Sequence, residues 1–109
     1  MSFWDAQHGL ALGGGDFPPE KASVVARTAD GGANWFEVGS PSGFRINIAV
    51  VATIGMDTAV AVGFTGSDIT TDRGRTWRRF DQTDLRGIDC ADGSCWAVGK
   101  DGQAAVLML

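Results

Sequence analysis

An eight-residue phrase that occurs twice constrains this chain more than any other feature. Residues 28–35 and residues 70–77 both read T-x-D-x-G-x-x-W. The aspartates stand at positions 30 and 72 and the tryptophans at positions 35 and 77, so both pairs are forty-two residues apart. A period in the low forties is the length of one four-stranded blade of a β-propeller. The repeat therefore predicts successive antiparallel sheets that stack radially.

Each phrase has the residues that a tight turn needs. A short aspartate side chain can accept backbone N–H bonds within the turn, and the glycine can adopt positive φ at little cost. The tryptophan then opens the next strand with a large apolar surface to bury. We interpret the phrase as structural, with catalysis by its aspartates as the alternative. The residues concerned are Thr28, Asp30, Gly32, Trp35, Thr70, Asp72, Gly74 and Trp77.

A second shared feature is a short apolar segment that ends at Gly13, Gly63 or Gly99 and reads GLALG, AVAVG or WAVG. An almost wholly apolar strand is typical of a position buried between two sheets. In the second unit, strands are predicted over about 46–52, 59–63, 68–71 and 77–80. The blades are predicted over 3–39, 45–81 and, incomplete, 86–109. The fold class is thus all-β: one partial propeller domain over 1–109, with two complete four-stranded antiparallel blades and a partial third.

The repeated phrase resembles the Asp-box of BNR and sialidase-type β-propellers, and its surroundings are similar to the photosystem II assembly-factor-like branch of that group. The resemblance covers nearly the whole chain. It implies that the box fastens the blade far from any active site, and that the chain is a non-enzymatic scaffold for protein recognition or assembly. In that branch, arginine-rich surface contributes to docking a protein client. This makes a basic patch of Arg73, Arg75, Arg78 and Arg79 a candidate client site, with solubilising arginines as the alternative interpretation.

The same resemblance raises an alternative function. Sialidases of this type use a tyrosine nucleophile, and this chain contains no tyrosine. A carbohydrate-binding propeller or a diverged glycosidase is therefore the alternative to protein recognition. A glycan could stack on Trp4 or Trp96 if these side chains were exposed, but their strand positions favour burial.

The architecture and the net charge indicate how the propeller ring could be completed and which partners to expect. A blade cannot bury both of its faces alone, and natural propellers close with about four to eight blades. We expect either self-association or further blades from a longer polypeptide. The net charge of −4 gives no reason to expect nucleic acid as a partner, and no apolar run is long enough to span a membrane. We expect no cofactor and, with one histidine and two cysteines, no metal site.

Cys90 and Cys95 bracket the sequence A-D-G-S, and Asp-Gly is a strong signal for a two-residue hairpin turn. In that register Ala91 pairs with Ser94, and the cysteines lie directly opposite each other at the Cα distance of about 4.5 Å typical of a non-hydrogen-bonded pair. This predicts a cross-strand disulfide, whose formation would favour an extracytoplasmic location. Two thiols packed in the hairpin are the alternative.

Topology divides the loops between two rims. In an up-and-down blade, the T-x-D turns and the cysteine hairpin share one rim. The loops between second and third strands share the opposite rim with the connectors between blades. Loops on a rigid scaffold tend to carry function, so this opposite rim is the candidate binding site, with loop packing as the alternative for its phenylalanines. Its residues are Asp16, Phe17, Glu20, Lys21, Phe44, Arg45, Phe64, Asp81 and Asp84.

Overall fold

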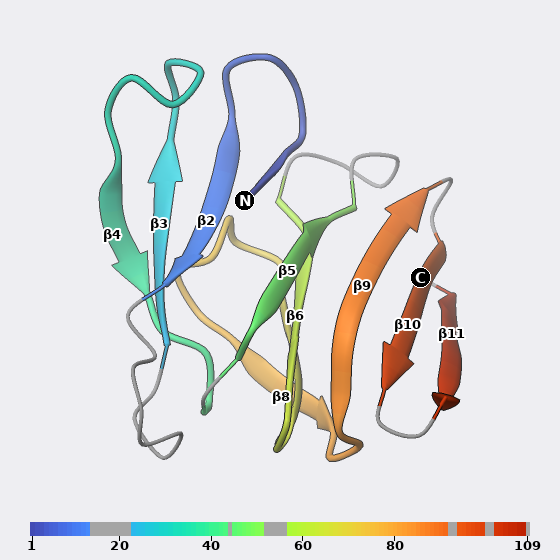
Figure 1. Cartoon of the computed structure of the whole chain (residues 1–109). Helices are drawn as coiled ribbons and strands as arrows, with labels where there is room; N and C mark the ends of the chain where they lie inside the picture. The colour runs from blue at the N-terminus through green and yellow to red at the C-terminus, as the bar shows by residue number, and fades with distance from the viewer. Residues whose placement is uncertain (14–22, 44, 52–56, 92–93, 100–101, 109) are drawn as a thin grey trace.

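Three antiparallel sheets lie side by side along the chain (Figure 1). The computed structural model describes residues 1–13, 23–43, 45–51, 57–91, 94–99 and 102–108. The first sheet contains β1 (Ser2–Phe3), β2 (Gly9–Gly13), β3 (Val24–Thr28) and β4 (Phe36–Gly39). The second contains β5 (Asn47–Val50), β6 (Ala59–Gly63), β7 (Gly66–Thr70) and β8 (Arg78–Asp81). The third contains β9 (Leu85–Ala91), β10 (Ser94–Gly99) and β11 (Ala104–Met108).

Within each sheet, neighbouring strands follow one another in the chain and pair antiparallel. This is the up-and-down order of a propeller blade, which confirms the predicted all-β class with two four-stranded blades and a three-stranded third. In the second sheet, β6 has its predicted bounds and β8 begins one residue later than predicted. The third strand begins at Gly66 rather than at 68, because Gly63 and Gly66 already pair across the turn.

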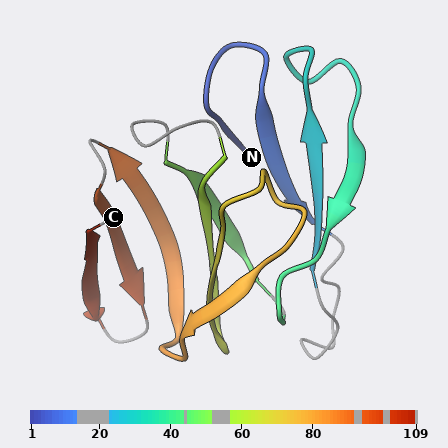
Figure 2. The same ribbon diagram turned by 180° about the vertical axis from the view of Figure 1, so that it is seen from behind.

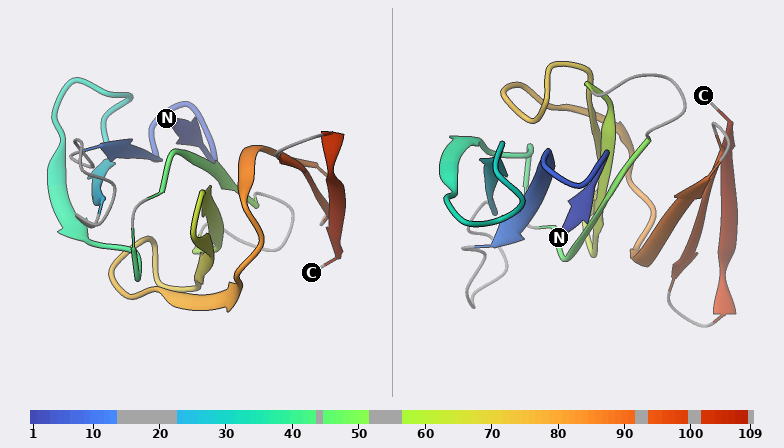
Figure 3. Two further views of the ribbon diagram at one scale, coloured as in Figure 1. Left: turned by 60° about the horizontal axis from the view of Figure 1, so that its bottom comes forward. Right: turned by 90° about the horizontal axis from the view of Figure 1, so that it is seen from above.

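The core lies between the sheets rather than within one of them. All five residues of β6 are buried. Its two small residues Ala59 and Ala61 belong to a cluster with Leu10 and Val25 of the first sheet. Val60 and Val62, on the other face of β6, belong to a second cluster with residues of the third sheet. The predicted burial of this apolar strand is confirmed, and Figures 2 and 3 show the middle sheet enclosed by its two neighbours.

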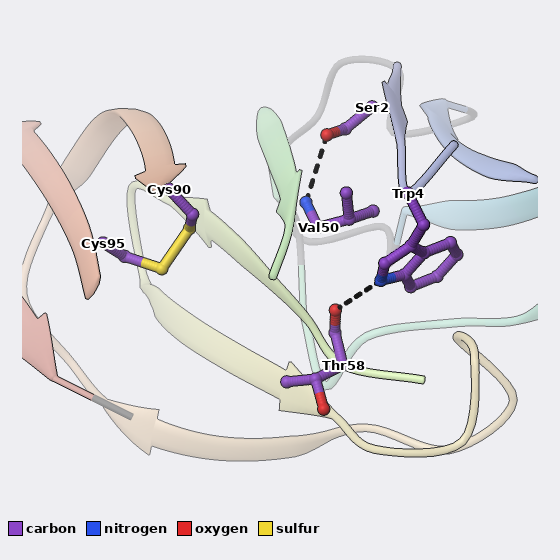
Figure 4. The surroundings of a disulfide bond; sticks show 6 residues. All are labelled: Ser2, Trp4, Val50, Thr58, Cys90 and Cys95. Carbon is purple, nitrogen blue, oxygen red and sulfur yellow. Dashed lines mark hydrogen bonds between the residues drawn. A yellow bond between two sulfur atoms is a disulfide. The ribbon is translucent and has the colours of Figure 1, made fainter. Parts of the chain in front are cut away.

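Two hydrogen bonds tie the N-terminal segment to the second sheet (Figure 4). The indole Nε1 of Trp4 donates to the carbonyl oxygen of Thr58 at 3.1 Å, and the hydroxyl of Ser2 accepts from the N–H of Val50 at 3.1 Å. Trp4 is buried, with 9% of its surface exposed. Its predicted burial is therefore confirmed.

The prediction of burial for Trp96 was wrong, because half of its surface is exposed. Trp96 lies on the face of β10 that points away from the second sheet, since its neighbours Cys95 and Ala97 are the ones that join the core. Val98 and Val106 are exposed as well. Within the described residues, the third sheet is thus packed on one face only. The described residues also contain no helix long and apolar enough to cross a membrane.

Candidate recognition rim

The first T-x-D turn is closed by its own side chains. The Thr28 hydroxyl donates to Asp30 Oδ1 at 2.8 Å and accepts from the N–H of Gly32 at 3.0 Å. The same Oδ1 accepts from the N–H of Asn34 at 2.9 Å, and Oδ2 accepts from its side-chain amide at 2.8 Å. The Thr28 and Asp30 side chains therefore accept from three backbone N–H groups of the turn, those of Asp30, Gly32 and Asn34.

The second turn repeats these bonds at a distance of forty-two residues. The Thr70 hydroxyl donates to Asp72 Oδ1 at 2.8 Å and accepts from the N–H of Gly74 at 3.0 Å. Asp72 also accepts from the N–H and the hydroxyl of Thr76. Asn34 and Thr76 were not predicted, because the shared phrase T-x-D-x-G-x-x-W leaves the position before the tryptophan variable. The sequence feature that could have indicated them is that both side chains, an amide and a hydroxyl, can donate a hydrogen bond to the aspartate of the turn.

Backbone conformation explains the glycines of the phrase. Gly32 and Gly74 have φ values of 98° and 89°, a region that other residues rarely adopt. Each turn is also fastened to the hairpin loop that precedes the second strand of its own sheet. The N–H of Gly31 donates to the carbonyl oxygen of Gln7 at 3.0 Å, and the N–H of Arg73 donates to that of Asp57 at 2.9 Å. The turn and the loop therefore lie at one rim.

Both aspartates of the turns are ionised more readily than usual. The hydrogen bonds from the side chain and N–H of Asn34, followed by that from Thr28, lower the pKa of Asp30 to about 2. Burial acts to raise the pKa of Asp72, but hydrogen bonds from Thr76 and Thr70 and the charge of Arg75 lower it on balance.

We expect Asn34→Ala to raise the pKa of Asp30 from about 2 toward its ordinary value of 3.8, because the variant loses the largest cause of the shift. A carboxylate with a depressed folded-state pKa adds stability that is present above about pH 4 and is lost as the pH falls through the folded-state value. The wild type should therefore lose this contribution between about pH 4 and pH 2, whereas the variant, whose Asp30 pKa is shifted less, should have less stability to lose over the same range. Carboxyl-carbon NMR titration measures both aspartates. The pKa of Asp72 should not move, and an unchanged Asp30 would contradict the assignment.

The basic patch is distributed over the second turn and β8. The Nε of Arg73 binds Asp57 Oδ1 at 2.8 Å, and this arginine has a φ of 64° within the turn. Arg75, Arg78 and Arg79 are exposed. Phe80, the next residue of β8, is exposed too. Two of the four arginines, Arg73 and Arg75, thus lie in the turn and two in β8, and the client patch stays a prediction.

At the opposite rim, Arg45 is buried rather than displayed. Only 2% of its surface is exposed, and its Nη2 lies 2.8 Å from Oδ1 of Asp68, which has no exposed surface. Its Nη1 donates to the hydroxyl of Thr65 at 3.1 Å. Ser42 donates from its N–H and its hydroxyl to the same carboxylate. The hydroxyl of Ser23 binds the Arg45 backbone at both its N–H and its carbonyl oxygen.

This buried cluster joins the connector before β5 to the third strand of the second sheet. A carboxylate that is fully withdrawn from water requires a cation and hydrogen-bond donors. Asp68 was not predicted as the partner of Arg45. The available signal was an aspartate inside an otherwise apolar and hydroxyl-bearing strand, where an unpaired charge would be costly.

An aromatic and a cation meet on the surface of this rim. The guanidinium of Arg86 lies 4.7 Å from the ring centroid of Phe64, which is 37% exposed. Arg86 also binds Asp84 at 3.2 Å through Nε. The structure therefore brings together Phe64 and Asp84 of the predicted rim and adds Arg86, which was not among the predicted residues. Asp81 of the predicted rim accepts hydrogen bonds at its Oδ1 from the N–H and from the hydroxyl of Thr83. The remaining predicted residues Asp16, Phe17, Glu20, Lys21 and Phe44 lie outside the described residues.

The predicted disulfide between Cys90 and Cys95 is confirmed (Figure 4). Ala91 pairs with Ser94, and the cysteines face each other with their Cα atoms 4.0 Å apart. Asp92 and Gly93, which the prediction placed in the turn, lie outside the described residues. The bond joins β9 to β10 on the face that packs against the second sheet.

Comparison with known proteins supports the fold. The chain is similar to a solved structure described as YCF48 bound to D1 peptide, with a TM-score of 0.73 and 20% sequence identity. The match covers 97% of this chain and 36% of that one, so the chain spans little more than a third of the length of this neighbour. No family model matches the sequence, and no curated protein matches it. The likeness is one of fold, and the three sheets of this chain are blades of the propeller type.

Proposed function

We propose that this chain is a non-enzymatic β-propeller module that recognises a segment of another protein, with its T-x-D turns acting as Asp-boxes. The geometry of the turns supports their role as Asp-boxes, because the threonine and aspartate side chains of each turn form hydrogen bonds with one another. The neighbour in the structural comparison is described as bound to a D1 peptide, which supports the first part. The proposal also includes the division of the chain: residues 1–109 form one partial propeller domain made of three blades.

The observation that carries the proposal is the contact between Phe64 and Arg86. Aromatic residues and arginine are the side chains most enriched where proteins bind one another. Arg86 is held by Asp84 and by the Phe64 ring, so its position is set before a partner arrives. Arg45 of the buried pair Arg45–Asp68 donates to the hydroxyl of Thr65, the residue that follows Phe64 in the chain. Such preorganisation lowers the entropic cost of binding.

A glycan-binding or glycosidase function has less support from the same rim. Trp4, one of the two tryptophans that could stack on a sugar, is buried against Thr58. Trp96 is exposed, but on the face of a sheet rather than at the rim. The sequence has no tyrosine to act as the nucleophile of a sialidase.

Selection from a display library of random twelve-residue peptides tests the proposal. The wild-type chain should enrich peptides that bind, and Phe64→Ser should weaken the selected peptides by tenfold or more, because the apolar part of the contact is lost. Arg86→Ala should weaken them as well. Phe36→Ser is the control, since this phenylalanine is also exposed but lies on β4 of the first sheet. Absence of enrichment, or binding that neither rim variant alters, would contradict protein recognition at this rim. The D1 peptide of the neighbouring structure is a second probe.

A further inference from the structure

A cavity of about 70 Å³ lies between the second and third sheets. Val60 and Ser67 line it on the side of the second sheet, and Cys95 and Ala97 line it on the side of the third. None of these four residues has more than 7% of its surface exposed. The inner wall of the cavity is therefore shielded from solvent, and Ser67 is the one polar side chain among the four.

Two polar side chains of the second sheet meet in this wall. Ser67 and Asp81 both line the cavity and pair directly across β7 and β8, so their side chains lie on one face of the sheet, about 5 Å apart. Val62, the partner of Ser67 on β6, packs toward the third sheet from the same face. The Ser67 hydroxyl is fully buried and has no hydrogen-bond partner among the described residues. Thr83 donates twice to Oδ1 of Asp81, so Oδ2 can accept a further bond.

The carboxyl group of Asp81 brings a negative charge to the cavity. The N–H and the hydroxyl of Thr83 lower the pKa of Asp81, so the group is ionised at neutral pH. An apolar molecule in the cavity would displace water from this carboxylate and from the Ser67 hydroxyl without offering a donor to either, which is unfavourable. A ligand that suits the cavity therefore combines a small apolar part with hydrogen-bond donors and a positive charge.

The volume of the cavity limits the size of the group that can enter. A cavity of about 150 Å³ accommodates benzene, so one of about half that volume accommodates roughly three non-hydrogen atoms. The end of a lysine side chain, with two methylene groups and the ammonium, has this size. An arginine guanidinium has five N–H donors, more than Ser67 and Asp81 can satisfy in an otherwise apolar wall. An alkylammonium group therefore fits the cavity best.

We propose that this cavity binds the terminal ammonium group of a lysine side chain presented by another polypeptide. The ammonium donates to Oδ2 of Asp81 and to the hydroxyl oxygen of Ser67. The aliphatic stem leaves the cavity past Phe80 and Ala105, two residues that also line it and are exposed. The site lies between two blades rather than at the rim of Phe64, and the proposal does not depend on the function proposed there.

Small molecules that differ only in their charged end test the chemistry of the site. The compound n-butylamine reproduces the lysine side chain beyond its Cα, and it should shift the NMR amide signals of Ser67, Asp81 and Cys95 saturably at neutral pH. The neutral n-butanol should bind about tenfold more weakly or worse, because it loses a hydrogen bond between charged groups. Butyrate, whose charge is negative, should not bind. The peptide acetyl-Gly-Lys-Gly-amide should shift the same signals as n-butylamine, because it presents the same side chain on a polypeptide.

Two conservative variants test the residues assigned to the site. Asp81→Asn keeps an Oδ1 that can accept both bonds from Thr83 but removes the charge, and it should weaken n-butylamine binding by about tenfold or more. Ser67→Ala removes a hydroxyl that has no partner in the described structure, so the variant should fold normally and bind the amine severalfold more weakly. Asp57→Asn is the control, because it removes an aspartate that is 59% exposed and lies at the rim of the T-x-D turns. It should leave binding unchanged.

Three results would each overturn the proposal. The first is the absence of a saturable shift with n-butylamine. The second is equal binding of n-butanol, or unchanged amine binding by Asp81→Asn, since the cavity would then select an apolar group and not a cation. The third is binding of n-butylamine without binding of the lysine peptide, which would restrict the site to free amines.

Discussion

Asp68→Ala should lower the free energy of unfolding of this chain by about 3–5 kcal/mol, the cost of breaking a buried ion pair by removing one partner. Neither side chain of the Arg45–Asp68 pair has more than 1% of its surface exposed, so water cannot replace the lost carboxylate. The variant would remove the carboxylate that lies 2.8 Å from the guanidinium of Arg45, which is buried beside Thr65 and Ser42. Urea denaturation followed by far-UV circular dichroism measures the difference.

Asp84→Ala is the matched control, because it also removes an aspartate from an ion pair with arginine. The Asp84 and Arg86 side chains are 29% and 49% exposed, so this pair should contribute no more than about 1 kcal/mol. Replacing both partners of the buried pair, with Arg45→Met and Asp68→Leu together, should cost less than Asp68→Ala alone, because no unpaired charge remains. Equal losses for Asp68→Ala and Asp84→Ala would contradict the role assigned to the buried pair.

The parts of the fold that were predicted correctly depend on local sequence. The T-x-D turns close within seven residues, because Thr28 and Asp30 bind donors no farther away than Asn34. The register of the cysteine hairpin follows in the same way from the four residues between Cys90 and Cys95. The almost wholly apolar sequence of β6 predicts a strand buried between two sheets, as all five of its residues are. Such features recur at a fixed period, so they can be read without knowing the tertiary structure.

The parts that could not be predicted depend on contacts between distant residues. Asp68 lies twenty-three residues after Arg45, and no local pattern indicates that the connector folds back to bury the arginine. Arg86 reaches Phe64 from the following sheet. Trp96 occupies the same place as Leu10 and Val60, three residues before the closing glycine of its strand. Its exposure depends on whether another sheet covers it, which is a property of the assembly rather than of the strand.

Leu10→Ala should lower the free energy of unfolding by about 2–5 kcal/mol, the usual range for deleting a fully buried leucine side chain from a core. Leu10 has no exposed surface, and it packs in the cluster that joins the first sheet to the second with Trp4, Val25 and Ile48. The substitution leaves every strand pairing within the first sheet intact. A loss of this size would therefore measure packing between blades rather than pairing within one.

Trp96→Ala is the control at the equivalent position of the third sheet. Because half of the Trp96 surface is already exposed in this chain, we expect a loss of less than about 1.5 kcal/mol there. Denaturation in urea compares the two variants, and near-UV circular dichroism of the Leu10 variant reports on the neighbouring indole of Trp4. If Trp96→Ala were as destabilising as Leu10→Ala, the outer face of β10 would already be covered in solution. A second sheet packed on that face would then have to come from another molecule, because residues 1–109 place none there within their described part.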